Sequence, residues 1–272
     1  DEVRRNYNAV ANNYGLVPRG FVPTDISGIV GWWDPSDSST VALSGSAVTT
    51  ITNKVSGGSS MVTYVLSPDI ATANLNGKDV LDFTLNEGLH TNTSLTTSSD
   101  VTVIMVAQLQ DPPAGASRTL LANSDVAPSN NQYRLACAYG GTSGAGNYQF
   151  IDYPPQTGTG QYHINGNTTA FVGGSVGPNN REDLRALIAD GTGWNIIAIA
   201  DLNFTSWIND FRIMRYFEGP TSYSCEGLLA DVIVYPSTLS TLDRQKVEGY
   251  VAHKYALQSK LPIGHPYKST AP

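Results

Sequence analysis

The chain has 272 residues, of which 14% are charged, and its formal net charge is −7. It has no concentrated lysines and arginines to neutralise phosphates, which argues against nucleic-acid binding. It also has no run of about eighteen apolar residues, so no membrane insertion is predicted. Abundant Gly, Ser, Thr and Asn between short runs of strand-forming residues favour one large all-β domain.

The first 25 residues are predicted to form an arm outside this domain, which we place at residues 26–272. Apolar residues recur there at the spacing of a short amphipathic helix, namely Val3, Tyr7, Val10 and Tyr14. The helix is expected to end at Gly15. An arm without its own core must pack on its own domain or on a partner, and both alternatives stay open. These four residues are therefore candidate partner-binding residues.

From Ile29 to Tyr235 the sequence predicts about fourteen short strands separated by turns, which is typical of β-sandwiches. The clearest are Val48–Thr52, Val62–Leu66, Val80–Thr84, Val101–Leu109, Arg118–Ala122, Tyr133–Tyr139, Tyr148–Tyr153, Gln161–Ile164, Thr169–Val172, Leu184–Ile188, Trp194–Ala200, Phe211–Tyr216 and Leu228–Tyr235. Asn76-Gly77 and Asn165-Gly166 predict tight hairpin turns. Cys137 and Cys225 lie in strand-like runs without a metal or redox spacing, and free buried thiols are predicted rather than a disulfide.

The C-terminal region predicts a strand, a turn, one amphipathic helix and a rigid tail. Both alternating sets of residues 228–235 are largely apolar, which indicates a strand covered on both faces. Ser240 is expected to cap the helix, with Asp243 in its first turn. The apolar stripe of the helix consists of Val247, Tyr250, Val251 and Tyr255, and its opposite, polar face, which is expected to be solvated, consists of Lys246, Glu248 and Lys254.

These motifs, in this order, resemble the concanavalin A-like lectin/glucanase superfamily, and within it the laminin G-like jelly-roll modules of microbial and phage proteins. The resemblance is carried by the turn at 32–37, the strand and turn at 48–57, the segment 76–83, and the closing elements at 227–235, 239–257 and 261–268. It implies a two-sheet antiparallel jelly-roll sandwich with one C-terminal helix. The chain departs from the family at Asn53, where an aspartate is usual.

Glucanases of this superfamily carry two catalytic carboxylates on one strand, where residues four apart share a face. No such pattern occurs here. Asp79, Asp82 and Glu87 straddle a turn, while Glu226 and Asp231 are expected to face opposite sides. No Gly-x-Ser-x-Gly motif is present either. We therefore predict no catalytic residue and no enzymatic activity.

Calcium is the one cofactor that the sequence leaves open. Asp34 and Asp37 lie in one tight turn and could offer oxygen ligands to Ca²⁺, with Asp231 nearby. The alternative is that both aspartates cap their own turn. His253 and His265 are expected to make structural hydrogen bonds rather than to bind metal.

A sugar-binding surface needs exposed aromatic rings beside amide and acidic side chains. The stretch 215–223 fits best, because Tyr216, Phe217 and Tyr223 flank a Gly-Pro turn and Glu218 lies between them. These four are the candidate ligand-binding residues. The alternative is that their rings pack beneath the turn.

Two functions fit the sequence, and a divergent hydrolase is a third alternative that only product release from glycans would revive. The first, whose context comes from the resemblance, is a non-catalytic lectin-like binding or assembly module. It would be a phage virion structural protein, serving in capsid decoration, in the tail or in receptor binding. Its arm would attach it to other virion or surface proteins, and homo-oligomers and glycan binding are compatible with it. The alternative is a carbohydrate-binding module of a secreted or cell-surface microbial protein. Both place the protein on a virion surface or outside the cell.

Overall fold

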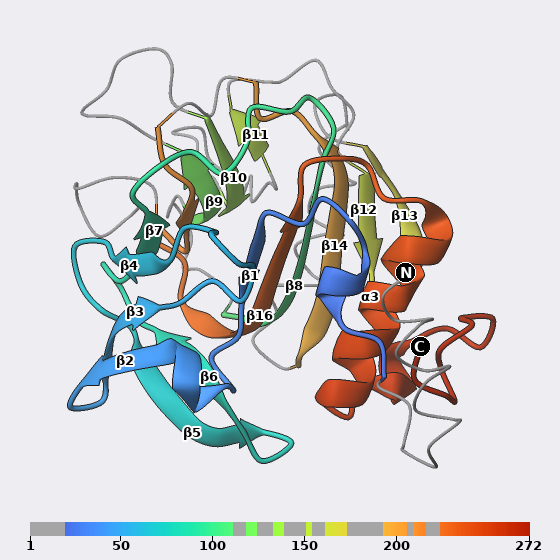
Figure 1. The fold of residues 1–272 in the computed structure, drawn as a ribbon, viewed down its shortest axis with the longest axis horizontal. Coiled ribbons are helices and arrows are strands. Elements are labelled where there is room, and N and C mark those ends of the chain that lie inside the picture. Colours follow the sequence, from blue (N-terminus) through green and yellow to red (C-terminus); the bar gives the residue numbers. More distant parts are fainter. Residues whose placement is uncertain are drawn as a thin grey trace, which may run out of the picture.

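The computed structural model describes residues 20–110, 118–123, 133–138, 151–153, 161–172, 193–205, 209–215 and 224–272. These parts form an antiparallel β-structure with one α-helix, α3 (Thr241–Lys254), near the C-terminus (Figure 1). The predicted all-β sandwich with a C-terminal helix is confirmed. The four arm residues, Val3, Tyr7, Val10 and Tyr14, lie outside the described residues, so the helical arm stays a prediction.

The strands follow one hydrogen-bonded path, and its two halves form two layers around a shared core. The helix-side layer contains β1 (Gly31–Trp33), β6 (Lys78–Phe83), β8 (Val101–Leu109), β12 (Gln161–Ile164), β13 (Asn167–Val172), β14 (Asn195–Leu202) and β16 (Gly227–Tyr235). The open layer contains β3 (Ala47–Ile51), β4 (Met61–Thr63), β7 (Leu89–Thr91), β9 (Arg118–Asn123), β10 (Tyr133–Ala138), β11 (Ile151–Tyr153) and β15 (Arg212–Ile213). β2 (Val41–Ser44) pairs with β3. β5 (Asp69–Leu75) pairs with both β3 and β6, so it connects the layers.

The predicted turns and the longest predicted strand agree with the structure. β8 has the predicted bounds, Val101–Leu109. Asn76 and Gly77 have φ angles of 50° and 71°, and Asn165 and Gly166 have 53° and 80°, which is the left-handed backbone of two-residue hairpins. The sequence does not single out β1, β2, β5 and β7, because pairing with neighbours rather than residue preference holds such short strands. The predicted strand Leu184–Ile188 lies outside the described residues.

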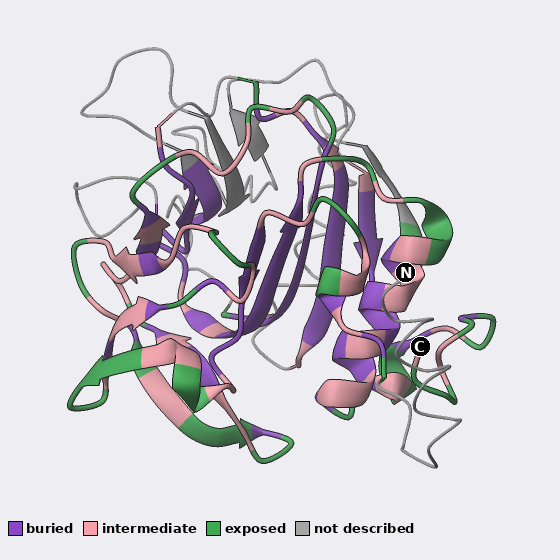
Figure 2. Ribbon diagram, viewed as in Figure 1, coloured by how far each residue is buried: buried purple, intermediate pink, exposed green. Residues whose placement is uncertain are grey.

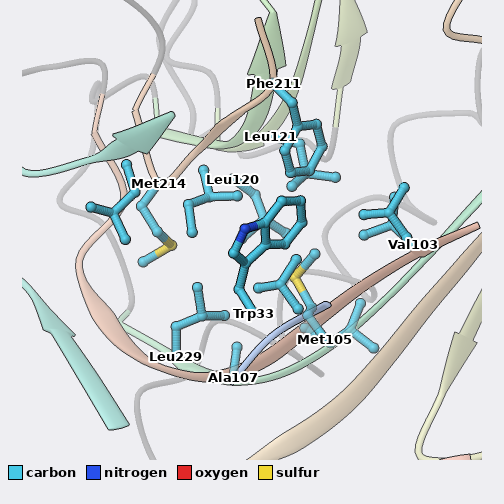
Figure 3. Close-up of a cluster of buried hydrophobic side chains, with 14 of the residues drawn as sticks. Trp33, Val103, Met105, Ala107, Leu120, Leu121, Phe211, Met214 and Leu229 are labelled. Carbon is cyan, nitrogen blue, oxygen red and sulfur yellow. The ribbon is translucent and has the colours of Figure 1, made fainter. Parts of the chain in front are cut away.

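Trp33 lies in the middle of the core shared by the two layers (Figure 3). Its side chain is buried, and its ring stacks on Phe211 with a centroid separation of 5.9 Å and an interplanar angle of 11°. Met105 from the helix-side layer and Leu121 from the open layer pack around it. Gly31 leaves room for the ring, since a Cβ there would come within 2.4 Å of it. Trp33 therefore joins the two layers.

A second core lies between the helix-side layer and α3 (Figures 1 and 2). Alternate residues of β8 serve the two cores: Met105 belongs to the shared core, and Ile104 and Val106 belong to the second. Val247 and Val251 of α3 are buried in this second core. β8 and β16 are almost entirely buried in Figure 2. The prediction that the closing strand is covered on both faces is confirmed.

α3 begins as predicted but differs on its polar face. The Ser240 hydroxyl accepts a hydrogen bond from the Asp243 N–H at 3.1 Å, which caps the helix. The prediction that Glu248 and Lys254 are solvated is wrong. The Glu248 side chain is fully buried, and that of Lys254 is 10% exposed. Lys254 pairs with Asp34 and Asp231 from elements distant in sequence. Glu248 pairs with Arg244, four residues earlier in α3, and contacts His265 of the C-terminal tail.

Cys225 is disulfide-bonded, so the prediction of free thiols is wrong. The only other cysteine of the chain is Cys137. A separation of about 90 residues gives no disulfide signal, because pairing cannot be deduced from spacing alone. Disulfides persist in oxidising compartments such as the cell exterior. The bond therefore agrees with the predicted extracellular localisation.

The turn after β3 is held by Asn53, which is buried. Its Oδ1 accepts hydrogen bonds from the N–H groups of Trp32 and Val55, both at 3.0 Å. Its Nδ2 donates to the carbonyl oxygens of Val30 at 3.0 Å and Ser59 at 3.2 Å. A side-chain amide can accept two bonds through its oxygen and donate two through its nitrogen, as this position requires. This explains why an asparagine suits this position.

Asn53→Asp is expected to lower the free energy of unfolding by about 2–3 kcal/mol, because it removes two donors and leaves two buried carbonyls unpaired. Urea unfolding measures the change. Asn203→Asp is the matched control, since the Asn203 Oδ1 only accepts bonds, from the N–H and hydroxyl of Thr205. It should change stability by less than about 0.5 kcal/mol. Equal losses in both variants would contradict this role of the Asn53 amide.

Candidate functional site

The two aspartates predicted as calcium ligands are paired with lysines. Lys54 Nζ lies 2.7 Å from Asp37 Oδ2 and 3.2 Å from Asp34 Oδ2, and Lys254 Nζ lies 2.6 Å from Asp34 Oδ1. Each aspartate also accepts a bond from the serine two positions later, as the turn-capping alternative predicts. Among the described residues, no three His, Cys, Asp or Glu side chains are grouped to hold a metal. Calcium binding stays a prediction.

These contacts keep both aspartates ionised. Hydrogen bonds from Lys54 and from Ser39 lower the pKa of Asp37 to about 2. Burial opposes ionisation of Asp34, but Lys254 and Lys54 together hold its pKa below its usual value. The network therefore ties the turn after β1 to the turn after β3 and to the end of α3.

A polar cluster lies on the outer face of the open layer. It consists of Tyr64, His90, Asp210 and Arg212, and we call it the outer-face cluster. His90 on β7 and Arg212 on β15 are register partners. The residues next to them along the strands, at positions 89 and 213, belong to the shared core. Because side chains alternate along a strand, His90 and Arg212 face outward.

The outer-face cluster is held by short contacts. The Arg212 guanidinium lies 4.2 Å from the centre of the Tyr64 ring and donates to the Tyr64 hydroxyl at 2.9 Å. Arg212 Nε donates to Asp210 Oδ2 at 2.6 Å, and His90 Nδ1 lies 3.2 Å from the same oxygen. The His90 side chain remains 21% exposed, whereas that of Arg212 is 8% exposed. The cluster thus combines a ring, a cation, a carboxylate and an accessible imidazole.

The predicted ligand loop begins and ends beside this cluster. Arg215 and Ser224 pair with one another as a β-bridge, so the ends of the 216–223 segment lie together. Asn86 links both ends: its N–H donates to the Ser224 hydroxyl at 2.9 Å, and its Oδ1 accepts from Arg215 at 2.9 Å. At Gly88 a Cβ would lie only 2.6 Å from the Arg215 Cβ. We call Asn86, Gly88, Arg215 and Ser224 the loop-base frame.

Two strained residues adjoin the cluster and the frame. Val65 has φ 69° and Met214 has φ 63°. A β-branched residue in this region is an outlier, and such strain costs about 1–3 kcal/mol. Val65 and its neighbour Leu66 are 45% and 51% exposed. Positive φ angles also occur at Ala73, Asp201 and Ala256, so strain by itself does not mark this place as a ligand site.

The fold also brings together carboxylates that are far apart in sequence. Asp69 on β5 and Asp82 on β6 are register partners. Burial, with the nearby charge of Asp69, raises the pKa of Asp82, and burial likewise raises the pKa of Glu87. Glu87 accepts bonds from the N–H and hydroxyl of Thr84, at 2.5 and 2.9 Å. Glu87 therefore caps a turn, and the carboxylates do not by themselves define a catalytic pair.

The four predicted ligand-binding residues, Tyr216, Phe217, Glu218 and Tyr223, lie outside the described residues. Ligand contact and packing beneath the turn both stay open for them. The structure does describe the loop-base frame, at which the 216–223 segment begins and ends.

The two C-terminal histidines make structural hydrogen bonds, as predicted. His253 Nε2 lies 2.9 Å from the carbonyl oxygen of Tyr267. His265 Nε2 lies 3.2 Å from Glu248 Oε2, and this pair is fully buried. Both histidines therefore fix the C-terminal tail against α3.

Sequence reasoning missed the outer-face cluster. Its members are spread from residue 64 to residue 212 and match no motif. The one signal available is the alternation of polar and apolar residues around His90 and Arg212, which puts each on a polar strand face. That they lie side by side depends on strand register, which no local pattern reveals.

No family model and no curated protein matches the chain. Among solved structures, it is similar to Trypanosoma rangeli sialidase in complex with sialic acid. The sequence identity is 12% and the TM-score is 0.46, and the match covers 93% of this chain and 38% of the sialidase. It is similar to Domain 4 of AbnA, a GH43 extracellular arabinanase from Geobacillus stearothermophilus, in complex with arabinotriose, with 11% identity, coverages of 79% and 95%, and a TM-score of 0.42. It is also similar to the binding domain of Paraclostridial Mosquitocidal Protein 1, with 10% identity, coverages of 84% and 53%, and a TM-score of 0.46.

These similarities assign neither a family nor an activity. The chain spans less than two fifths of the length of the sialidase. The β-sandwich is established by the described strands, while the narrower resemblance to concanavalin A-like modules stays a prediction. Within the described residues, no helix is both long and apolar enough to cross a membrane.

Proposed function

We propose that this protein is a non-catalytic carbohydrate-binding module. Its ligand would lie on the outer-face cluster and on the 216–223 segment that starts from the loop-base frame. The observation that carries this proposal is the outer-face cluster itself, on a sheet face that no described helix covers.

The chemistry of the cluster suits a sugar. Sugar rings present apolar C–H faces that pack on aromatic rings, and hydroxyl groups that need oriented donors and acceptors. His90 and Asp210 supply both kinds of hydrogen-bonding group within 3.2 Å of one another. The four predicted loop residues would add three aromatic rings and one further carboxylate.

The location of the cluster also supports a binding role. The Phe21 N–H donates to the carbonyl oxygen of Pro272 at 3.3 Å, so the segment that follows the predicted arm meets the C-terminus. Phe21 packs in the second core with α3, on the opposite side of the molecule from β4 and β7 (Figure 1). A partner or a neighbouring domain attached near Phe21 would leave the proposed sugar site open.

The test is binding to an array of neutral and sialylated glycans, followed by calorimetry with the glycans that bind. Tyr223→Ala and His90→Ala are each expected to weaken binding about tenfold or more, or by about 1.4 kcal/mol, through loss of stacking and of a hydrogen bond. Leu242→Ser is the control, because Leu242 is 53% exposed on α3 and distant from the site.

An array without hits on folded protein would contradict the proposal. Binding that both site variants retain would place the sugar elsewhere. Release of sugar products from a bound glycan would instead revive the enzymatic alternative, with Asp82 and Glu87 as the first carboxylates to replace.

The virion-assembly hypothesis rests on Val3, Tyr7, Val10 and Tyr14 and on the family resemblance. No described residue adds to it. It therefore stays a prediction beside the carbohydrate-binding proposal, with which it is compatible.

A further inference from the structure

One buried amine lies between two buried carboxylates. Lys254 Nζ is 2.8 Å from Asp231 Oδ2 and 2.6 Å from Asp34 Oδ1. The side chains of Lys254, Asp231 and Asp34 are 10%, 0% and 4% exposed. The amine comes from the end of α3, one carboxylate from β16 and the other from the turn after β1. Three separate elements thus meet at one dry site.

The two oxygens of Asp231 have different partners. Trp32 Nε1 donates a hydrogen bond to Oδ1 at 2.9 Å, whereas Oδ2 faces Lys254. A fixed N–H donor of this kind stabilises the negative charge that forms on a carbonyl oxygen when a nucleophile adds to its carbon. In an attack by the amine on the Asp231 carboxyl group, Oδ1 would therefore remain as the carbonyl oxygen and Oδ2 would be the leaving group.

Burial favours the neutral form of the Asp231 carboxyl group. A buried carboxylate loses its hydration, and this raises the pKa of Asp231. The ring of Tyr255, which is buried, lies 4.9 Å from Lys254 Nζ and helps to exclude water. A protonated carboxyl group, unlike a carboxylate, can be attacked by an amine, so the raised pKa of Asp231 favours its reactive form.

We propose that Lys254 and Asp231 condense spontaneously into an isopeptide bond that joins α3 to β16. The neutral Lys254 Nζ attacks Cγ of the protonated Asp231 carboxyl group, while Trp32 donates to Oδ1. Asp34 accepts the proton that Nζ loses and passes it to the departing Oδ2 hydroxyl. One C–N bond forms, one C–O bond breaks and one water molecule leaves. No oxidant or reductant takes part.

The geometry supplies each component of this reaction. Lys254 Nζ lies 2.8 Å from Asp231 Oδ2, so the amine is held against the carboxyl group, and this replaces a bimolecular encounter. Asp34, which would carry the proton, contacts Lys254 Nζ, and Trp32, which would stabilise the oxyanion, donates to Asp231.

The test is the intact mass of the purified full chain after reduction and denaturation. We expect a mass lower than that of the sequence by one water molecule. Trypsin should then release peptides 216–244 and 247–260 as one branched species, because a linked Lys254 is not cleaved. A chain with the full sequence mass would overturn the proposal.

Variants locate the bond. Lys254→Arg and Asp34→Asn are expected to have their full sequence masses. Asp37→Asn is the matched control, since Asp37 lies in the same turn but pairs with Lys54, and it should keep the loss of water. Asp231→Asn should reach the same linked mass by losing ammonia, which checks the site even if another variant folds poorly. Loss of water that persists in Lys254→Arg would place the dehydration elsewhere and overturn the proposal.

Discussion

Glu248→Ala is expected to lower the free energy of unfolding by about 3–5 kcal/mol, because it leaves a buried guanidinium without its carboxylate. Glu248 is fully buried in α3 and accepts a hydrogen bond from Arg244, whose side chain is 6% exposed. Its other oxygen lies 3.2 Å from His265 Nε2 in the C-terminal tail. Chemical denaturation at neutral pH measures the loss.

The matched control removes both charges. Arg244→Met combined with Glu248→Leu keeps similar volumes and leaves no unpaired guanidinium. His265 Nε2 loses its partner in both variants, so the double variant should recover the stability that Glu248→Ala loses through the unpaired guanidinium. If the double variant is no more stable than Glu248→Ala, the prediction is wrong, and Glu248 stabilises the fold through packing rather than through its charge.

Reducing the disulfide of Cys225 is expected to lower the free energy of unfolding by about 4 kcal/mol. The bond closes a loop of about 90 residues, and it stabilises the fold by limiting the conformations of the unfolded chain. Urea unfolding with and without dithiothreitol measures the difference.

The control is the Cys225→Ser/Cys137→Ser variant, which should match the reduced protein and show no further response to dithiothreitol. A wild-type protein whose midpoint does not change on reduction would contradict the disulfide. Such a result would restore the prediction of free thiols.

The closing helix shows how far the sequence alone can lead. Its cap at Ser240 and its apolar stripe depend on residues three or four positions apart, which local spacing reveals. The apolar stripe of α3 is buried as expected, with Val247 and Val251 fully so. Glu248 and Lys254, however, are charged residues of the same helix, and their burial could not be predicted without their partners in the tail, in β16 and in the turn after β1.

The sequence likewise predicted part of the candidate site. The aromatic residues of segment 216–223 stand out in the sequence, and its ends prove to lie together at Arg215 and Ser224. His90 and Arg212 did not stand out, because their significance comes from being opposite one another on neighbouring strands. A register pair between residues more than a hundred positions apart leaves no local pattern.

The sequence by itself determined the all-β class, the tight turns at Asn76 and Asn165, the doubly covered strand β16 and the capped helix that follows it. Each depends on side-chain periodicity or on backbone preferences of a few consecutive residues. Only the tertiary structure decided which polar side chains are buried and what pairs with them, as for Asn53, Asp231 and Glu248. Burying a polar group is costly unless a partner compensates for it, and here the partners come from strands, turns and helices that folding alone brings together.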